Sequence, residues 1–259
     1  MTTTGPDAAH ADLLARLERL EREASPLEPG PEERARLREA VEASAERFLQ
    51  GIDTLRAYVE TPDRGAGLLD SPIGEGGIRL ERVLEHGEHD VVRPGGNPAS
   101  PAHLAYIPGG PLYHAALGDY LAAVHNKYAG IFFTGPGPVR MENMLLRWTA
   151  DLVGYPAGAG GNIASGGSIA NLTAIVTARH AHGLKGADFA RTVVYLTTQA
   201  HPSVDKALRI AGLGEVQLRY VPTDERFRMR PDALAGAIAA DRAGGLRPWM
   251  VVAAAGTTG

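Results

Sequence analysis

The chain has 259 residues, of which 26 are basic and 30 acidic, so its formal net charge is −4. This balance provides no basic surface for nucleic acid or an anionic membrane, and the absence of cysteine excludes disulfides, cysteine-ligated metals and a cysteine nucleophile. No apolar run reaches the length of a membrane span, and the N-terminus lacks the layout of a signal peptide, so we expect a cytoplasmic protein.

The first hundred residues predict helices followed by connecting structure. Leucines at helical spacing among charges predict a helix over residues 11–24, and a Pro- and Gly-containing break separates it from a second helix over residues 32–50. Residues 61–101 are rich in Gly and Pro, which is typical of a linker, with a short helix at 78–86. We therefore assign residues 1–101 to an N-terminal helical segment and linker.

From residue 102 the pattern changes to helices that later alternate with strands. Helices are predicted at 113–127, 140–153, 168–181, 201–212 and 231–242, and buried or half-buried strands at 192–198, 216–222 and 249–255. This alternation predicts an α/β domain with a parallel sheet over residues 102–259. Ligands of such sheets bind at the carboxyl ends of the strands, where residues 199–201 and 256–259 fall.

Residues 164–182, ASGGSIANLTAIVTARHAH, predict a glycine turn that opens directly into an amphipathic helix. Gly166 and Gly167 carry no Cβ, so the backbone there can approach a bound group closely. Ser168 occupies the N-cap or first turn, and a helix start of this kind binds phosphate through its unpaired N–H groups and its dipole. The Walker pattern would need a lysine before Ser168, so a small phosphate-bearing ligand is favoured over a triphosphate. The alternative is an ordinary strand-to-helix turn with a serine cap.

Five segments share their order and spacing with the motifs of one enzyme family. They are AYIPGGPLY (105–113), GPGPVRMENMLLRWTADLVGYP (135–156), SGGSIAN (165–171), QAHPSVDKALRIAGLG (199–214) and AAAGTTG (253–259). Together they resemble the group II pyridoxal-phosphate decarboxylases, the family of aromatic-amino-acid, glutamate and histidine decarboxylases, in its N-terminal portion. The resemblance implies the large domain of the fold-type I PLP-dependent transferases, incomplete here and preceded by the N-terminal helical segment.

The same resemblance implies a site for pyridoxal 5'-phosphate (PLP). Gly167 and Ser168 would hold the phosphate through backbone N–H groups and the hydroxyl, as the physics of a helix N-terminus also favours. His201 would stack on the pyridine ring near the substrate carboxylate and is the implied catalytic residue. Thr258, and less directly Thr257, would line the cofactor near its ring substituents. Read without the motif, His201 would be a strand-end histidine that only hydrogen-bonds within the sheet.

Two further groups of residues have weaker signals. Tyr106, Ile107 and Pro108 would border the substrate side chain by resemblance, although an aromatic residue before Pro-Gly-Gly is also typical of a packed turn. The spacing of His86 and His89 would allow them to bind one metal ion. They lie in a charged, Gly-rich segment without further ligands, so we expect a solvated loop and no metal site.

The chain also departs from the family pattern. Ile169 and Arg140 stand where the family has glutamates. The family continues with an aspartate that pairs with the pyridinium nitrogen and a lysine that forms the Schiff base, and none of Lys127, Lys185 and Lys206 fits that lysine motif. We therefore expect a fragment of a longer protein, inactive and poorly soluble by itself, with an uncovered sheet edge.

For the longer protein, the resemblance implies a carboxy-lyase that converts an L-amino acid to its amine and CO₂. Another fold-type I PLP enzyme (an aldehyde synthase, a carbon–carbon lyase or an aminotransferase) and a non-catalytic remnant are the alternatives. The resemblance also implies a homodimer, with no nucleic-acid or membrane partner. The substrate side chain is left open by the sequence.

Overall fold

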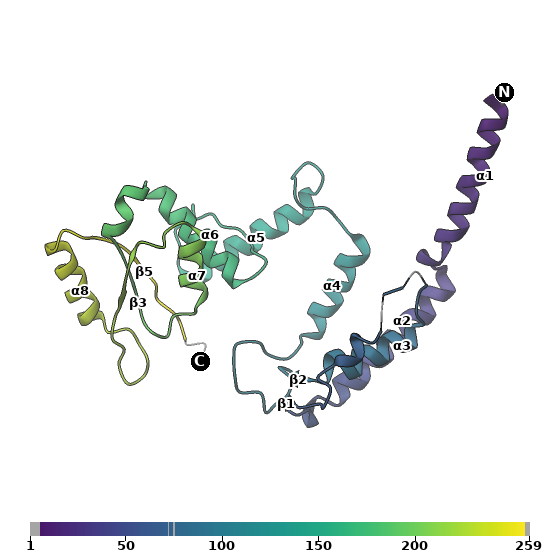
Figure 1. Cartoon of the computed structure of the whole chain (residues 1–259), viewed down its shortest axis with the longest axis horizontal. Coiled ribbons are helices and arrows are strands. Elements are labelled where there is room, and N and C mark those ends of the chain that lie inside the picture. The colour runs from purple at the N-terminus through teal and green to yellow at the C-terminus, as the bar shows by residue number, and fades with distance from the viewer. Residues whose placement is uncertain (1–5, 72, 75, 257–259) are drawn as a thin grey trace. The chain divides into compact units, whose positions relative to one another are not determined.

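The computed structural model describes residues 6–71, 73–74 and 76–256, and the chain divides into two compact units. The first unit comprises Met1–Leu104 and Pro108–Pro111, and the second comprises Ala105–Ile107 and Leu112–Gly259. Figure 1 labels the elements of each unit. Within the described residues, no helix combines the length and apolar character needed to cross a bilayer.

The first unit is mainly helical. Its elements are α1 (Pro6–Ala24), α2 (Pro31–Gln50), β1 (Tyr58–Val59), α3 (Leu80–His86), a π-helical turn (Gly87–Val92) and β2 (Gly95–Gly96). Pro31 starts α2 because its fixed φ suits the first helical position, where no N–H donor is needed. β1 and β2 pair antiparallel, and Arg36 of α2 forms an ion pair with Glu81 of α3 at 3.4 Å. The predicted helices are confirmed within a few residues, and the linker contains more structure than its composition indicated.

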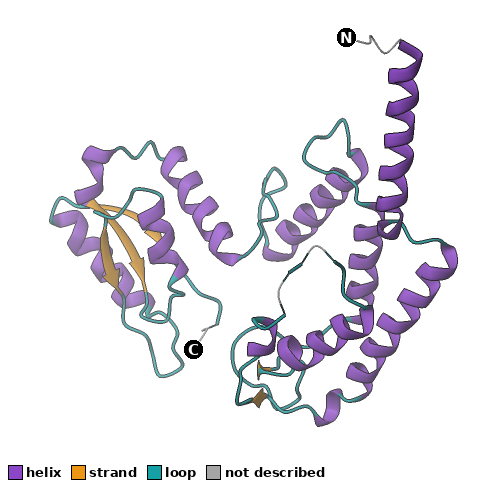
Figure 2. Cartoon of the chain, turned by 45° about the vertical axis from the view of Figure 1, so that its right-hand side comes forward, coloured by secondary structure: helices purple, strands orange, loops and turns teal. Residues whose placement is uncertain are grey.

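The second unit holds the predicted α/β pattern. Its helices are α4 (Tyr113–His125), α5 (Pro136–Val153), α6 (Gly167–Ala181), α7 (Ser203–Ile210) and α8 (Pro231–Ala243), and its strands are β3 (Thr192–Leu196), β4 (Gln217–Tyr220) and β5 (Arg247–Val251). The strands form one parallel sheet in the order β4-β3-β5. Figure 2 shows this sheet with helices on both sides. The predicted parallel sheet is confirmed, although each strand is shorter than its sequence pattern.

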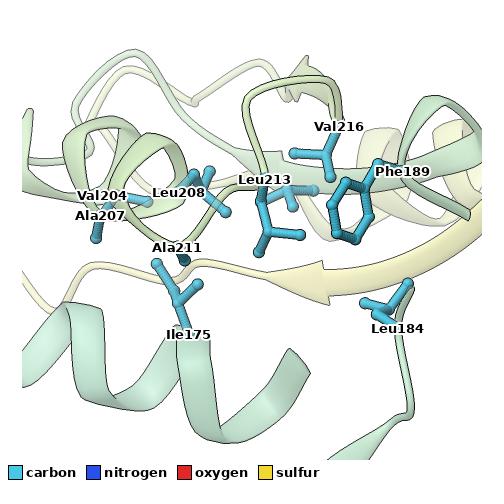
Figure 3. Packing of buried hydrophobic residues seen from close by; sticks show 10 residues of the cluster. Ile175, Leu184, Phe189, Val204, Ala207, Leu208, Ala211, Leu213 and Val216 are labelled. Carbon is cyan, nitrogen blue, oxygen red and sulfur yellow. The ribbon is translucent and has the colours of Figure 1, made fainter. Parts of the chain in front are cut away.

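The central strand β3 divides the apolar core into two layers. Val194 lies in a cluster with Ile175 of α6 and Leu208 of α7, whereas Val193 and Tyr195 lie in a second cluster that packs against α8. This division follows from the strand geometry, because successive side chains point to opposite faces of a sheet. Figure 3 shows Ile175 pointing from α6 toward α7 in the first of these clusters. The sheet is therefore a middle layer between α6 and α7 on one face and α8 on the other.

Three helices of this unit end in the same way, with a Gly-Leu pair. In each, a glycine adopts a positive φ between 59° and 76° and the following leucine donates its N–H back to the helix, which is the Schellman arrangement. The three pairs are Gly183-Leu184 after α6, Gly212-Leu213 after α7 and Gly245-Leu246 after α8. All three leucines then pack in or against the two core clusters. The helix ends thus also fix where the chain re-enters the core.

The apolar residues of α6 and β4 are only partly buried. On α6, Ile175 is buried and Leu172 packs against the core, but Ile169 and Val176 are exposed. On β4, Leu218 packs against the core but Tyr220 is 58% exposed. The core therefore uses only part of the apolar surface of α6 and β4.

Candidate functional site

The glycine turn before α6 presents two open amide donors. Gly166 is the N-cap of α6 and has an extended backbone, and the first hydrogen bonds of the helix run from the N–H groups of Ile169 and Ala170 to the carbonyl of Gly166, at 3.1 and 3.0 Å. The N–H groups of Gly167 and Ser168 therefore lie ahead of the first helical bond. Ser168 is a first-turn residue and not the N-cap, and the described contacts include no side-chain cap at this helix.

Neither glycine is required by the fold itself. Gly166 has φ 168°, an extended value that any residue adopts, and a Cβ built on Gly166 or Gly167 meets no atom within 4 Å. Bare backbone is therefore exposed at both glycines. Two donors, the positive end of the α6 dipole and room for close approach together suit a small anion.

His201 lies beside this turn and is held by a short hydrogen-bonded network. Its Nδ1 accepts the backbone N–H of Ser203 at 3.1 Å and lies 2.7 Å from the Ser203 hydroxyl. The Ser203 hydroxyl in turn accepts the side-chain amide of Asn171, at 2.8 Å. Asn171 lies in the second turn of α6 and Ser203 is the first residue of α7, so the network joins the N-terminal ends of the two helices.

This network places the predicted cofactor residues together. Gly167, Ser168 and His201 come from segments more than 30 residues apart, and the Asn171–Ser203 bond across 32 residues connects them. Ser203 is only 6% exposed, whereas His201 is exposed. The site thus combines a buried supporting residue, Ser203, with an accessible imidazole near the open amides.

A cavity of about 440 Å³ opens at the carboxyl edge of the sheet. Its walls come from the segments that follow β3 and β5, including Gln199 and Gly256, and from the loop between β4 and α8. Asp224 fixes that loop by accepting the backbone N–H groups of Arg226 and Arg228 and the Arg228 guanidinium. The cavity is at the edge where the sequence predicted ligand binding.

The remaining predicted site residues have a different status. Tyr106 and Ile107 are 81% and 77% exposed, Pro108 is exposed, and Tyr106 has a positive φ of 65°. Their role on the substrate side stays a prediction. Thr257 and Thr258 lie outside the described residues, so their predicted role in lining the cofactor also stays a prediction.

The histidine-rich segment of the first unit differs from its prediction. His86 ends α3 and its Nδ1 lies 2.8 Å from Asp90, within a π-helical turn and not in a solvated loop. Both side chains are largely buried, because α3 and the turn pack together. Across the described residues, no three His, Asp or Glu side chains gather as metal ligands would.

A second polar network lies on the other face of β3. The Tyr195 hydroxyl donates to Asp241 at 2.9 Å, and the Arg219 guanidinium donates to both carboxylate oxygens, with a shortest distance of 2.9 Å. The hydrogen bond from Arg219, with further help from Tyr195, holds the pKa of Asp241 below its usual range. Burial, followed by the bond to Asp241, raises the pKa of Tyr195 to about 12.

Two residues of the candidate site were not assigned a role from the sequence. Asn171 and Ser203 stand within the quoted motifs SGGSIAN and QAHPSVDK, but nothing in the local pattern says that they meet. The only sequence signal was their spacing: Asn171 falls less than one helical turn after Ser168, and Ser203 follows two residues after His201.

Comparison with known proteins places this arrangement in context. Residues 75–259 match the family described as the pyridoxal-dependent decarboxylase conserved domain. The aromatic-L-amino-acid decarboxylase of Bacillus atrophaeus is 38% identical over 158 residues, which cover 61% of this chain and 32% of that protein. The aromatic-L-amino-acid decarboxylase of Sus scrofa is 31% identical over 245 residues, which cover 87% of this chain and 49% of that protein. The chain thus spans half or less of the length of these relatives.

Solved structures share the fold. The crystal structure of Oryza sativa TDC with PLP and tryptamine matches with a TM-score of 0.77 and 24% identity, over 89% of this chain and 50% of that one. The fold class predicted from the sequence, part of an α/β large domain preceded by a helical segment, is thereby confirmed.

Proposed function

This chain belongs to the pyridoxal-dependent decarboxylase family, and we propose that it is part of a PLP-dependent L-amino-acid decarboxylase whose cofactor phosphate binds at the N-terminus of α6. One observation carries the assignment of the phosphate site. The amides of Gly167 and Ser168 are open to a ligand, behind two glycines that neither the backbone conformation nor any neighbouring atom requires. A ligand that packs directly against the backbone would explain why both positions are glycine.

The residues present fit a phosphate monoester. Its dianion matches the amides of Gly167 and Ser168, the Ser168 hydroxyl and the dipole of α6, and the Asn171–Ser203 bond brings the start of α7 close by. When bound, PLP supplies an electron sink for the bond between the substrate's Cα and its carboxylate. The protein's contribution at this position is to fix the cofactor and to exclude other orientations.

His201 is the candidate for contact with the ring and the substrate. Its imidazole is exposed, and the backbone N–H of Ser203 occupies its Nδ1, which leaves Nε2 as the nitrogen available to a ligand. Such a donor is suited to hold a carboxylate oxygen before the carboxylate leaves as CO₂. Thr257 and Thr258, which follow β5, are proposed to line the cofactor from the neighbouring strand.

We propose an aromatic L-amino acid as substrate and its amine as product. The names of the relatives from Bacillus atrophaeus and Sus scrofa support this class. Tyr106, Ile107 and Pro108 are proposed to border the substrate side chain. Product analysis separates this reaction from those of an aldehyde synthase and an aminotransferase. Simple decarboxylation gives amine and CO₂ in equal amounts, and the other two reactions do not.

We further propose that these 259 residues bind the cofactor without turnover. All three lysines, Lys127, Lys185 and Lys206, are exposed, and none follows the family's lysine motif. Borohydride reduction of the chain with added PLP should therefore show no selective linkage of the cofactor to one lysine, and an aromatic amino acid should release no CO₂. Release of CO₂ by the chain alone would contradict this part of the proposal.

We also propose association into a homodimer. The support is the apolar face of α1, where Leu13, Leu17 and Leu20 are each about half exposed, at 52%, 52% and 44%. Light scattering on the purified chain tests this proposal, and a monomer at micromolar concentration would contradict it.

The phosphate site is tested by Gly167→Ala. A Cβ at this position clashes with nothing in the protein, so the free energy of unfolding should stay within about 1 kcal/mol of the wild type. The added methyl group should nevertheless weaken the binding of PLP and of inorganic phosphate by roughly tenfold or more. It keeps the charged phosphate from accepting hydrogen bonds from the backbone amides. Calorimetric titration measures both ligands.

Gly137→Ala is the matched control. Gly137 also lies in the first turn of a helix, α5, and its added Cβ likewise meets no atom within 4 Å. This variant should bind PLP like the wild type. Equal PLP affinity in Gly167→Ala and the wild type would overturn the phosphate site.

A further inference from the structure

We propose that Asn171 and Ser203 are positioning residues that hold His201 as the tautomer with its proton on Nε2. This inference rests on the proposed function for its purpose, since it states how the candidate catalytic imidazole is prepared. The tautomer itself follows from contacts inside the protein and is measurable without any cofactor.

The direction of each hydrogen bond is set by the groups that take part. The backbone N–H of Ser203 is only a donor, and it lies 3.1 Å from Nδ1 of His201. Nδ1 must therefore be the bare, accepting nitrogen. A neutral imidazole carries one proton, so that proton is on Nε2.

The side chains of Asn171 and Ser203 reinforce this choice. The Asn171 amide donates to the Ser203 hydroxyl oxygen at 2.8 Å, which leaves the hydroxyl proton free to point to Nδ1 of His201, 2.7 Å away. The three groups form one donor chain that runs from α6 through the start of α7 to the imidazole. Ser203 is 6% exposed, so solvent offers its hydroxyl little competition.

The chain also couples the two parts of the site mechanically. Asn171 belongs to the helix whose first turn carries Gly167 and Ser168, and Ser203 begins the helix that follows His201. The open amides and the imidazole are thus held in one frame, with Nε2–H as the outward donor. A ligand with an anionic group at each end would find both donors preset.

The test is the ¹⁵N spectrum of the imidazoles in the whole 259-residue chain at alkaline pH, where the rings are neutral. Protonated and bare ring nitrogens have widely separated shifts, and His201→Gln identifies the signals of His201. We expect a single form with a bare, hydrogen-bonded Nδ1 and a protonated Nε2. A wild-type His201 that carries its proton on Nδ1, or that is an even mixture, would overturn the proposal.

Two variants then test the side chains. Ser203→Ala removes the hydroxyl donor but keeps the backbone N–H, and the minor tautomer should rise roughly fivefold, as the loss of one neutral hydrogen bond predicts. Asn171→Asp keeps the shape of the side chain but turns it into an acceptor, so the Ser203 hydroxyl should donate to the new carboxylate and no longer to Nδ1. The same rise is expected.

Asn162→Asp is the control for charge, because Asn162 is exposed and precedes the same helix. It should leave the tautomer unchanged. If neither Ser203→Ala nor Asn171→Asp changes the tautomer of His201 while both remain folded, the positioning role is wrong. A purely structural role would alter unfolding without altering the tautomer, and a failure of the proposed function would appear only in PLP binding, so the two failures are distinguishable.

Discussion

The two polar networks of the second unit lie on opposite faces of the sheet and differ in what they leave exposed. On the face of α6 and α7, Asn171 and Ser203 support a histidine that remains open to a ligand. On the face of α8, Tyr195 and Asp241 are both buried and satisfy each other together with Arg219. The comparison teaches that hydrogen bonding alone does not mark a functional site, because the network with an outward donor is the one that suits a ligand.

Shifted pKa values would lead to the wrong face. Strongly perturbed groups are often functional, yet the shifts at Tyr195 and Asp241 arise from burial and from their own bonds. Neither Tyr195 nor Asp241 lines the cavity, although Thr197 and Met229, which lie close to Tyr195 in the sequence or in the core, do so. We therefore interpret the Tyr195–Asp241–Arg219 network as structural, and the predictions below test that difference.

The largest expected effect on stability comes from Asp241→Ala. It leaves the Tyr195 hydroxyl and part of the Arg219 guanidinium without a partner. We expect a loss of about 2 kcal/mol in the free energy of unfolding, a value that is kept modest because Arg219 is partly exposed to solvent. Urea denaturation measures the loss. Asp232→Ala, which breaks an exposed pair on the same helix, is the control and should cost much less. A loss of PLP affinity with unchanged stability would mean that this network is functional.

Tyr195→Phe should have a smaller effect. The ring stays in the core and only the hydroxyl is lost, while Asp241 keeps Arg219, so we expect a loss of about 1 kcal/mol. Tyr220→Phe is the matched control on the neighbouring strand β4, where the side chain is mostly exposed, and it should be neutral. Equal effects of the two substitutions in urea denaturation would show that the Tyr195 hydroxyl adds nothing.

The smallest effect is a pH dependence at both ends of the range. The pKa of Asp241 is lowered in the folded chain, so its contribution is present above the unfolded value of about 3.9 and is lost as the pH falls through the folded value. The pKa of Tyr195 is raised to about 12, so its contribution is complete below the unfolded value and is lost as the pH rises toward 12.

Unfolding curves of the wild type and Asp241→Ala should therefore converge in acid. Those of the wild type and Tyr195→Phe should converge in strong alkali. A constant difference between each pair across the whole range would contradict the assigned pKa directions.

The sequence by itself determined the order of the elements and the nature of the α6 turn. Apolar spacing, the glycine turn before α6 and the Pro- and Gly-containing break before α2 act over a few neighbouring residues, so they can be read from the sequence without the fold. The glycines and the resemblance likewise led to Gly167, Ser168 and His201. The first turn of α6 needed only local information.

The tertiary structure decided which side chains meet. Asn171 and Ser203 are 32 residues apart, and Tyr195 and Asp241 are 46 apart, so their bonds exist only once parallel strands and their helices have packed. The same packing decided that Tyr220 is exposed and that His86 bonds to Asp90 within a π-helical turn. Local patterns specify the elements because neighbouring residues share one backbone geometry, whereas a polar partner from another element is chosen by how those elements pack.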